Sequence, residues 1–519
     1  MEEKKQMPDF LKKIWSSIPI TDRFCFSVSL ITGLLVHFYM LSNKITNLDD
    51  IVCVPGVGGG KVLGRWFQEP VHDLFSPWSS PALNGIMAII ILSIAACIIV
   101  NTLKIESITG AVLIGITMMT IPSTASNMYY MYLAPTFALS ILASTINVQI
   151  TSKYKFGFIL GSVLQFFSMA CYQAYFGLSA SLFVLLYFLM LIDGGDILII
   201  VKKGLRSIIG LGIAMGGYLI SLKFVDLSDY KGLSDIGHTS AGDILLAVLR
   251  AYHRVLQYFI TEPESFMKGS PTLFNRVLVI LLIGIIVILF IKKKIYIKPV
   301  RLILSVILLI ILPLALGLVY VMAPQLSHAS TVMIYSYSVF YFMIIAGMER
   351  LLTTGRGNKG LVFFASIIFI TLLLEFYSSA RVINNAYYRS YIAQNRVMQY
   401  YNRILSKLEE AEGFQYGEPL TILGGFYPDP LPVANHDMNG KELADFEGAT
   451  LEDLLFLPTN RDRVLQIWFG LETGDVTSDK KEKIMETEEF KQMPIYPADG
   501  CAKKIDGVWV IKINEDDSK

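Results

Sequence analysis

Two adjacent carboxylates follow the first long apolar segment of the sequence, in the stretch Asn47-Leu48-Asp49-Asp50. A carboxylate that is partly shielded from water can act as a general base, because desolvation raises its pKa toward neutrality. A neighbouring carboxylate raises one of the two pKa values further, and the pair could also hold a divalent cation such as Mg²⁺ or Mn²⁺. Asp49 and Asp50 are therefore candidate catalytic and metal-binding residues. The structural alternatives are a solvated loop pair or a helix N-cap.

Two further short elements carry side chains suited to a phosphorylated sugar. Arg65 and Trp66, in Gly64-Arg65-Trp66, offer a cation for phosphate and an aromatic platform for a sugar ring. Tyr172 and Gln173, in Tyr172-Gln173-Ala174-Tyr175, offer an amide that could hydrogen-bond a hydroxyl-rich ligand. The alternatives are an interfacial anchor for the first element and a helix-to-helix contact for the second.

Residues 223–274 contain an amphipathic stretch, which predicts a helix lying in the membrane interface. Its apolar residues at helical spacing are Leu245, Val248, Leu249, Tyr252, Leu256 and Phe259. Arg250, His253 and Arg254 fall on another face and could meet a lipid phosphate, as could His328 in a later loop. These cations could equally belong to an ordinary surface helix and loop. His37, inside the first apolar segment, is expected to be packed or hydrogen-bonded.

The composition requires a membrane protein. The chain has 519 residues, of which 53% are hydrophobic and 17% charged, and a mean hydropathy of +0.53. Its net charge of +1 shows no nucleic-acid footprint. Hydropathy predicts about eleven transmembrane helices, near residues 24–41, 84–103, 107–122, 132–150, 156–171, 178–198, 205–222, 275–291, 302–322, 330–348 and 360–376. The predicted fold is a polytopic α-helical membrane protein.

The distribution of lysine and arginine predicts its orientation. Basic residues gather in alternate connections, including Lys202-Lys203 and Lys292-Lys293-Lys294, whereas the turns 123–131 and 323–329 hold none. The positive-inside rule then places the N-terminus in the cytoplasm and the first loop, residues 42–83, outside. It also places everything after Glu375 outside.

The tail, residues 377–519, has a different composition from the rest of the chain. It holds 24 acidic residues against 16 basic ones. It opens with a predicted helix from Arg381 to Glu412, followed by strand-like runs at 421–423 and 508–511. The prediction is a transmembrane domain of residues 1–376 followed by a small α+β extracytoplasmic domain.

Together these elements resemble the GtrII-type membrane glucosyltransferases of the GT-C superfamily. The resemblance rests on the order of four elements over residues 20–400: the Asp49-Asp50 pair, Gly64-Arg65-Trp66, Pro122 and the Tyr172–Tyr175 element. It implies a GT-C-like fold in a bacterial plasma membrane. It also implies a polyprenyl-phosphate-linked sugar donor, most simply undecaprenyl-phosphate glucose, and a cell-surface glycan acceptor.

The mechanism that this resemblance suggests is a single inverting displacement at the outer face of the membrane. One of Asp49 and Asp50, with a slight preference for Asp50, would take the proton of the acceptor hydroxyl. Arg65, Arg250, His253 or Arg254, or a divalent cation, would stabilise the departing polyprenyl phosphate.

Other functions stay open at this point. A transporter or flippase of lipid-linked sugars would need a charge-lined path through the membrane, which the apolar segments do not provide. A glycan polymerase is a further alternative. An acyltransferase would need a histidine at the catalytic face, for which His328 is the candidate.

Overall fold

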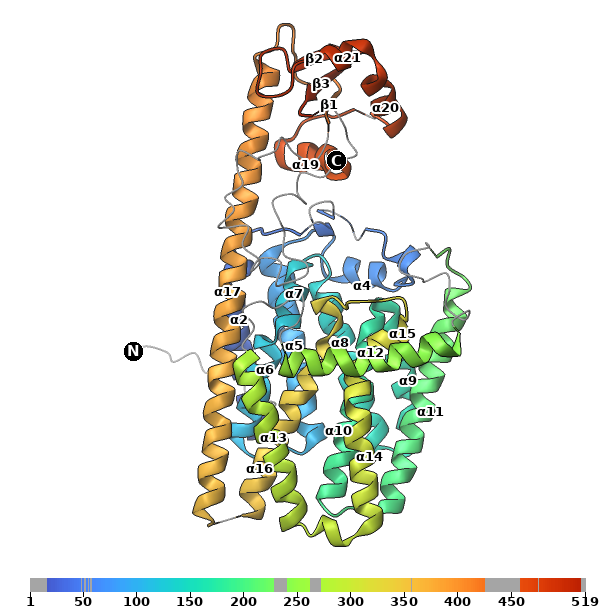
Figure 1. The fold of residues 1–519 in the computed structure, drawn as a ribbon, viewed down its shortest axis with the longest axis vertical. Coiled ribbons are helices and arrows are strands. Elements are labelled where there is room, and N and C mark those ends of the chain that lie inside the picture. Colours follow the sequence, from blue (N-terminus) through green and yellow to red (C-terminus); the bar gives the residue numbers. More distant parts are fainter. Residues whose placement is uncertain are drawn as a thin grey trace, which may run out of the picture.

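The computed structural model describes residues 16–47, 49–50, 53–54, 56, 58–227, 240–261, 272–355, 357–424, 458–474 and 476–514. Its main body is a bundle of helices, most of which run in roughly the same direction (Figure 1). One long helix, α17, extends beyond this body and leads to a smaller unit that contains the only strands of the described ranges (Figure 1).

The helices of the bundle follow the predicted apolar segments. Their bounds are α2 Ile20–Ser42, α5 Pro81–Leu103, α6 Ile108–Thr120, α7 Pro122–Tyr129, α8 Ala134–Lys153, α9 Gly157–Cys171, α10 Phe176–Ile192, α11 Ile197–Leu222, α12 Ala241–Ile260, α13 Thr272–Lys292, α14 Pro299–Leu316, α15 Leu318–Met322, α16 Ser338–Thr354 and α17 Lys359–Glu409. Short elements between them are η1 Lys61–Leu63, α4 Gln68–Phe75, η2 Gln173–Tyr175, η3 Ile295–Ile297, η4 Thr331–Met333 and η5 Tyr335–Tyr337.

This arrangement supports a membrane protein. Fewer helices than the eleven expected are, however, long and apolar enough to count as membrane spans. Among the described residues, six helices are long and apolar enough to cross a membrane. The number is seven if α6 and α7 form one span, bent by 43°. The bend has a local cause, because Pro122 at the start of α7 has no N–H to continue the α6 hydrogen-bond ladder.

The connections separate into two ends of the bundle. At one end, Arg350 Nη2 lies 2.8 Å from Asp193 Oδ2, and Arg301 Nη2 donates to the Gly195 carbonyl at 2.9 Å. The Glu349 carboxylate accepts from the Ser107 hydroxyl at 2.9 Å, at the start of α6. These contacts join turns that the distribution of basic residues predicts to lie on one side. The first loop, α7, α12 and α15 lie toward the opposite end (Figure 1).

Helix α12 lies across the bundle helices, as the amphipathic pattern predicts (Figure 1). The predicted apolar face is, however, mostly not the packed one: Leu245, Leu249 and Leu256 are exposed. The packed residues are Ala247, Ala251 and Val255, together with Tyr258 and Phe259 near the end of the helix. Close packing selects the small residues among these, because a Cβ on Gly317 would lie only 2.9 Å from the Ala251 carbonyl oxygen. The large leucine side chains remain on the exposed side of the helix.

Helix α17 connects the bundle to the C-terminal unit. Its 51 residues span about 77 Å at 1.5 Å per residue, far more than the roughly 30 Å hydrocarbon core. The helix predicted from Arg381 is therefore the continuation of the last apolar segment. The proposed domain boundary at residue 376 falls inside this single helix.

The C-terminal unit contains a three-stranded sheet in the order β1-β3-β2. Strand β1 (Leu420–Leu423) pairs with β3 (Val508–Lys512) in parallel, and β2 (Ala502–Ile505) pairs with β3 antiparallel. The two strand-like runs of the sequence are β1 and β3. Helices α19 (Pro458–Phe469), α20 (Ser478–Glu486) and α21 (Glu488–Gln492) complete the unit. Arg461 of α19 is buried and donates to the Gly424 carbonyl at 2.8 Å.

The crossing of α12 over Gly317 gives a stability prediction. Gly317→Ala should destabilise the protein by about 1–3 kcal/mol, because the new methyl group overlaps the Ala251 backbone. The measurement is the thermal unfolding midpoint of the purified protein in lipid nanodiscs. Gly212→Ala is the matched control, since a Cβ there meets no atom within 4 Å. Equal midpoints for the two variants would contradict this packing.

Candidate active site

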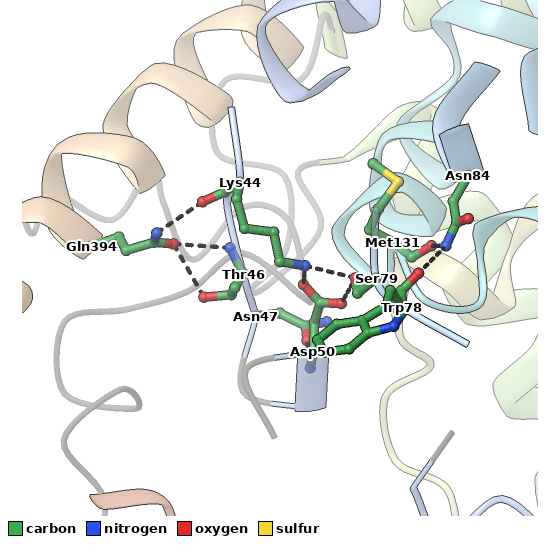
Figure 2. Close-up of polar contacts among 9 residues, drawn as sticks. All are labelled: Lys44, Thr46, Asn47, Asp50, Trp78, Ser79, Asn84, Met131 and Gln394. Atoms are coloured by element: carbon green, nitrogen blue, oxygen red, sulfur yellow. Dashed lines mark hydrogen bonds and ion pairs between the residues drawn. The ribbon is translucent and has the colours of Figure 1, made fainter. Parts of the chain in front are cut away.

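Asp50 is the centre of a buried polar cluster in the loop between α2 and α5 (Figure 2). Its side chain has no solvent exposure. The Lys44 ammonium pairs with Oδ2, and the Ser79 hydroxyl donates to Oδ1. Lys44 also donates to Ser79 at 2.6 Å, so that the three side chains form a closed set.

The two carboxylates have different environments. Asp49 is exposed, whereas Asp50 is buried. Both have helical backbone, and the Asn47 side chain accepts from the Asp50 N–H at 2.6 Å, as an N-cap residue does. The alternative of a capped helix start therefore applies to Asn47, with Asp49 and Asp50 in its first turn. Carboxylates in that position are favoured by the helix dipole.

The pKa of Asp50 reflects two opposing effects. Burial raises the pKa above its ordinary value, because a charged carboxylate loses its hydration. The positive charge of Lys44 and the hydrogen bonds from Lys44, Ser79 and the Tyr132 backbone oppose that rise. Burial is the larger effect. Lys44 is therefore what keeps the anionic form of Asp50 accessible inside the protein.

Helix α17 holds the cluster from the other side (Figure 2). Gln394 accepts from the Thr46 backbone N–H at 2.9 Å and donates to the Lys44 carbonyl at 2.8 Å. One amide side chain thus hydrogen-bonds the backbone of both neighbours of Ile45 and holds in place the segment that carries Lys44. Asn84, on α5, supports the far side by donating to the carbonyls of Trp78 and Met131 at 3.1 and 3.2 Å.

A second group brings together Arg65, Trp66, Tyr172 and Gln173. The Arg65 guanidinium lies 4.6 Å from the centroid of the Tyr172 ring, and its Nε donates to Gln173 at 3.3 Å. Gln173 in turn donates to the Leu63 carbonyl at 2.8 Å. Trp66 donates to Ser221 of α11 at 3.1 Å. Gln173 therefore also makes a helix contact of the kind given as the structural alternative, since it donates to the Tyr218 hydroxyl of α11 at 2.7 Å.

A third group brings together Arg250, Arg254 and His328. Arg250 donates to the carbonyls of Pro324 and Leu326 at 2.7 and 2.9 Å, which fastens the loop to α12. Arg254 Nη2 lies 3.3 Å from His328 Nε2. His253 is exposed on the same helix. Arg250 thus has a structural role, whereas Arg254, His253 and His328 form a basic edge.

The donor set at Asp50 does not fit a divalent cation. Lys44 already neutralises the carboxylate, and a second cation would be repelled by its ammonium group. Within the described ranges, no three His, Cys, Asp or Glu side chains lie together as metal ligands. The chemistry of the site is therefore derived from the protein side chains alone.

Several functional candidates escape sequence reasoning. Lys44, Ser79 and Gln394 belong to the Asp50 cluster but carry no motif, since Gln394 is 344 residues away from Asp50. Glu375 is a buried carboxylate that lies 2.9 Å from the Ser379 hydroxyl and 3.3 Å from that of Tyr341. In the sequence, only its position at the end of the last apolar segment could have marked Glu375 as a candidate.

His37 is packed as expected. It is fully buried and its two ring nitrogens lie 2.8 Å from the Tyr387 hydroxyl and 3.0 Å from the Met119 carbonyl. Both hydrogen-bonding positions of the ring are used. It therefore links α2 to α17 and has no nitrogen left for chemistry.

Comparison with known families decides the general activity. Residues 38–348 match the model of the family described as glucosyl transferase GtrII, which is more than half of the chain. This chain belongs to the GtrII glucosyl transferase family. No curated protein and no solved structure matches it. The resemblance seen in the sequence is confirmed.

Family membership makes this protein a glycosyltransferase, which takes a sugar donor and a glycan acceptor. The matched region contains the Asp50 cluster up to Asn84, the Arg65 group, and the group around Arg254. It ends before α17, so Gln394 and the C-terminal unit lie outside it.

The buried ion pair gives a pH-dependent prediction. Lys44→Met should destabilise the protein by about 3–5 kcal/mol at pH 8, because it leaves a buried carboxylate without a cation. The pKa of Asp50, already raised by burial, should rise further in this variant. A carboxyl group whose pKa is higher in the folded than in the unfolded state loses stability as pH rises through that interval. The deficit relative to the native chain should therefore be smaller at pH 5.

Thermal unfolding midpoints at the two pH values measure this effect. Lys202→Met is the matched control, because Lys202 is exposed at the opposite end of the bundle. Adding Asp50→Asn to Lys44→Met should restore stability and remove the pH dependence. A Lys44→Met deficit that is the same at pH 5 and pH 8 would mean that Asp50 is not the group left unpaired.

Proposed function

We propose that this glycosyltransferase moves glucose from a polyprenyl-phosphate donor to a cell-surface glycan at the outer face of a bacterial plasma membrane. The observation that carries the proposal is the position of the acidic first loop, at the end of the bundle opposite the turns joined by Arg350 and Asp193. The prenyl tail of such a donor stays in the bilayer, so its phosphate lies where helix ends meet loops. The proposal includes a GT-C-like architecture with a cytoplasmic N-terminus and an extracytoplasmic C-terminal domain, and this placement is what supports it.

The structure supports separate roles for the two carboxylates. Asp49 is the general base, because its side chain is exposed and can approach an acceptor hydroxyl. Asp50 is a positioning residue, because Lys44 and Ser79 occupy both of its oxygens. The preference for Asp50 as the base, which its second position in the pair suggests, is therefore reversed in this proposal.

The reaction is one displacement with inversion. The acceptor oxygen forms a bond to the anomeric carbon while the bond from that carbon to the phosphate oxygen breaks. Asp49 takes the proton of the acceptor hydroxyl, and the electron pair leaves with polyprenyl phosphate. No step uses a metal ion.

Arg65 is the cation proposed to stabilise the leaving phosphate. Tyr172 and Gln173 hold its guanidinium in place through the ring face and Nε. Among the described residues, its two terminal nitrogens have no hydrogen-bond partner, and they can therefore bind two phosphate oxygens. Arg254 adds positive charge at the edge of α12, and His253 and His328 add exposed ring nitrogens there. Trp66 anchors the element to α11.

The C-terminal unit is proposed to position the acceptor glycan. It lies at the same end as the first loop, and α17 connects the two through Gln394 (Figure 1). An acceptor bound to this unit would therefore lie close to the first loop.

The carboxylate roles can be tested with radiolabelled polyprenyl-phosphate glucose and protein in nanodiscs. Asp49→Asn should lower kcat by about 10²–10⁴-fold while donor binding is kept, because only proton transfer is lost. Asp50→Asn should show a smaller loss of kcat together with lower thermal stability. Glu69→Gln, at an exposed acid of the same loop, is the control.

Three results would change the proposal. A large loss in Asp50→Asn with normal turnover in Asp49→Asn would exchange the two roles. Native turnover in both variants would make the pair structural. Failure of the native chain to consume this donor would reject the proposed donor and favour another lipid-linked sugar substrate, or the transport of one.

The phosphate role of Arg65 predicts a different kinetic pattern. Arg65→Gln should weaken binding of sugar-free polyprenyl phosphate by about 10–100-fold, the usual effect of removing a hydrogen-bonded charge. Lys61→Gln, which removes an exposed charge from the same loop, should leave binding within twofold. Equal affinity of the Arg65→Gln variant and the native chain would exclude Arg65 as the phosphate ligand.

A further inference from the structure

Two buried polar side chains near the candidate active site have atoms without partners. Asn127, on α7, is 2% exposed, and Thr331, on η4, is 1% exposed. Among the described residues, Asn127 Nδ2 and Thr331 Oγ1 have no hydrogen-bond partner. An unpaired polar atom in the interior costs about 1–3 kcal/mol. Such atoms are retained where a bound molecule satisfies them.

The orientation of Asn127 is fixed by a neighbour. The Tyr175 hydroxyl lies 3.2 Å from the side-chain oxygen of Asn127. The Tyr175 ring lies edge-on to that of Tyr335, with centroids 6.0 Å apart. The amide oxygen of Asn127 is thus hydrogen-bonded within the protein, whereas its Nδ2 group can donate to a bound molecule.

Contacts connect these residues to the groups of the candidate active site. Helix α7, which carries Asn127, is followed by Met131, whose carbonyl accepts from Asn84 beside the Asp50 cluster at 3.2 Å. Tyr175 follows Tyr172, the platform for Arg65, and their rings lie 5.2 Å apart. Thr331 follows His328 by three residues, on η4, which packs against α7. Asn127 and Thr331 therefore lie on two elements that pack against each other, and Asn127 is linked to the Arg65 group through Tyr175 and Tyr172.

The chemistry of this place suits a neutral, hydroxyl-rich group. An amide N–H and a hydroxyl hydrogen-bond sugar hydroxyls, and tyrosine rings pack against the apolar face of a pyranose. A phosphate would require cations instead. The prenyl chain, being apolar, could not satisfy either atom.

We infer that Asn127 and Thr331 form the subsite that binds the hexose ring of the lipid-linked donor. The inference rests on the proposed function and deepens it, since it assigns sugar recognition to α7 and η4 and leaves the phosphate to Arg65. Sugar specificity then depends on residues that are distinct from those that bind the phosphate.

Binding of two lipids separates sugar recognition from phosphate recognition. The full chain in nanodiscs is titrated with polyprenyl-phosphate glucose and with sugar-free polyprenyl phosphate. The native chain should bind the glucose-bearing lipid more tightly. In Asn127→Leu and Thr331→Val this preference should fall by about five- to tenfold per variant, while the affinity for polyprenyl phosphate stays unchanged.

The ligand-free variants provide a second readout. Thr331→Val replaces an unpaired buried hydroxyl by an apolar group of similar size, so its unfolding midpoint should not fall. Asn127→Leu also removes the acceptor of the Tyr175 hydroxyl, so its midpoint should fall. Thr117→Val is the matched control, because Thr117 is equally buried but its hydroxyl donates to the Leu113 carbonyl at 2.7 Å. It should leave the preference for the glucose-bearing lipid unchanged.

Two outcomes overturn the inference. The first is that both variants keep the native preference for the glucose-bearing lipid, which would assign the two atoms to bound water. The second is that the native chain binds the two lipids equally. A native chain that prefers the glucose-bearing lipid yet transfers no glucose would reject the proposed function and leave the subsite standing.

Discussion

The burial of the Asp50 carboxylate is the constraint on which the candidate site depends. A carboxylate removed from water must be paired with a cation and hydrogen bonded, or else protonated. Lys44 and Ser79 meet that requirement here, and they come from the two ends of the first loop. The ion pair and its hydrogen bonds therefore hold the two ends of the first loop together.

The requirement extends beyond the loop itself. Gln394 binds the backbone on either side of Ile45, so the segment that carries Lys44 is tied to α17. Helix α17 continues into the C-terminal unit, whose sheet follows at residue 420. A single rigid element thus joins the proposed acceptor-binding unit to the residues around the carboxylates. A change in the tilt of α17 would therefore move the backbone of Lys44, which Gln394 binds.

The opposite end of the bundle is built in a different way. There, Arg350 pairs with Asp193, and Glu349 caps the start of α6. Arg301 donates to the carbonyls of Leu191, in the last turn of α10, and of Gly195, just after this helix. The charged side chains at this end form ion pairs and hydrogen bonds that join the turns to one another. The end that carries the first loop has exposed polar side chains instead, among them Asp49, His253 and His328.

The sequence alone determined the class of the protein and much of its helical layout. Apolar segments long enough to span a bilayer are a one-dimensional property, so hydropathy locates them without knowledge of their neighbours. The amphipathic stretch at 241–260 and the strands near 421 and 508 are local patterns of the same kind. The order of the Asp49-Asp50, Arg65-Trp66 and Tyr172-Gln173 elements was likewise enough to indicate the GtrII family.

Only the tertiary structure decided how those elements combine. The adjacent Asp49 and Asp50 look equivalent in the sequence, but burial separates an exposed carboxylate from a paired one. Lys44, Ser79 and Gln394 join the cluster through contacts that span up to 350 positions, and no local pattern encodes such contacts. The same holds for Asn127 and Thr331, since an unpaired buried atom exists only once the chain has packed around it. Patterns along the chain set which segments enter the membrane, whereas packing sets which polar groups those segments leave available for chemistry.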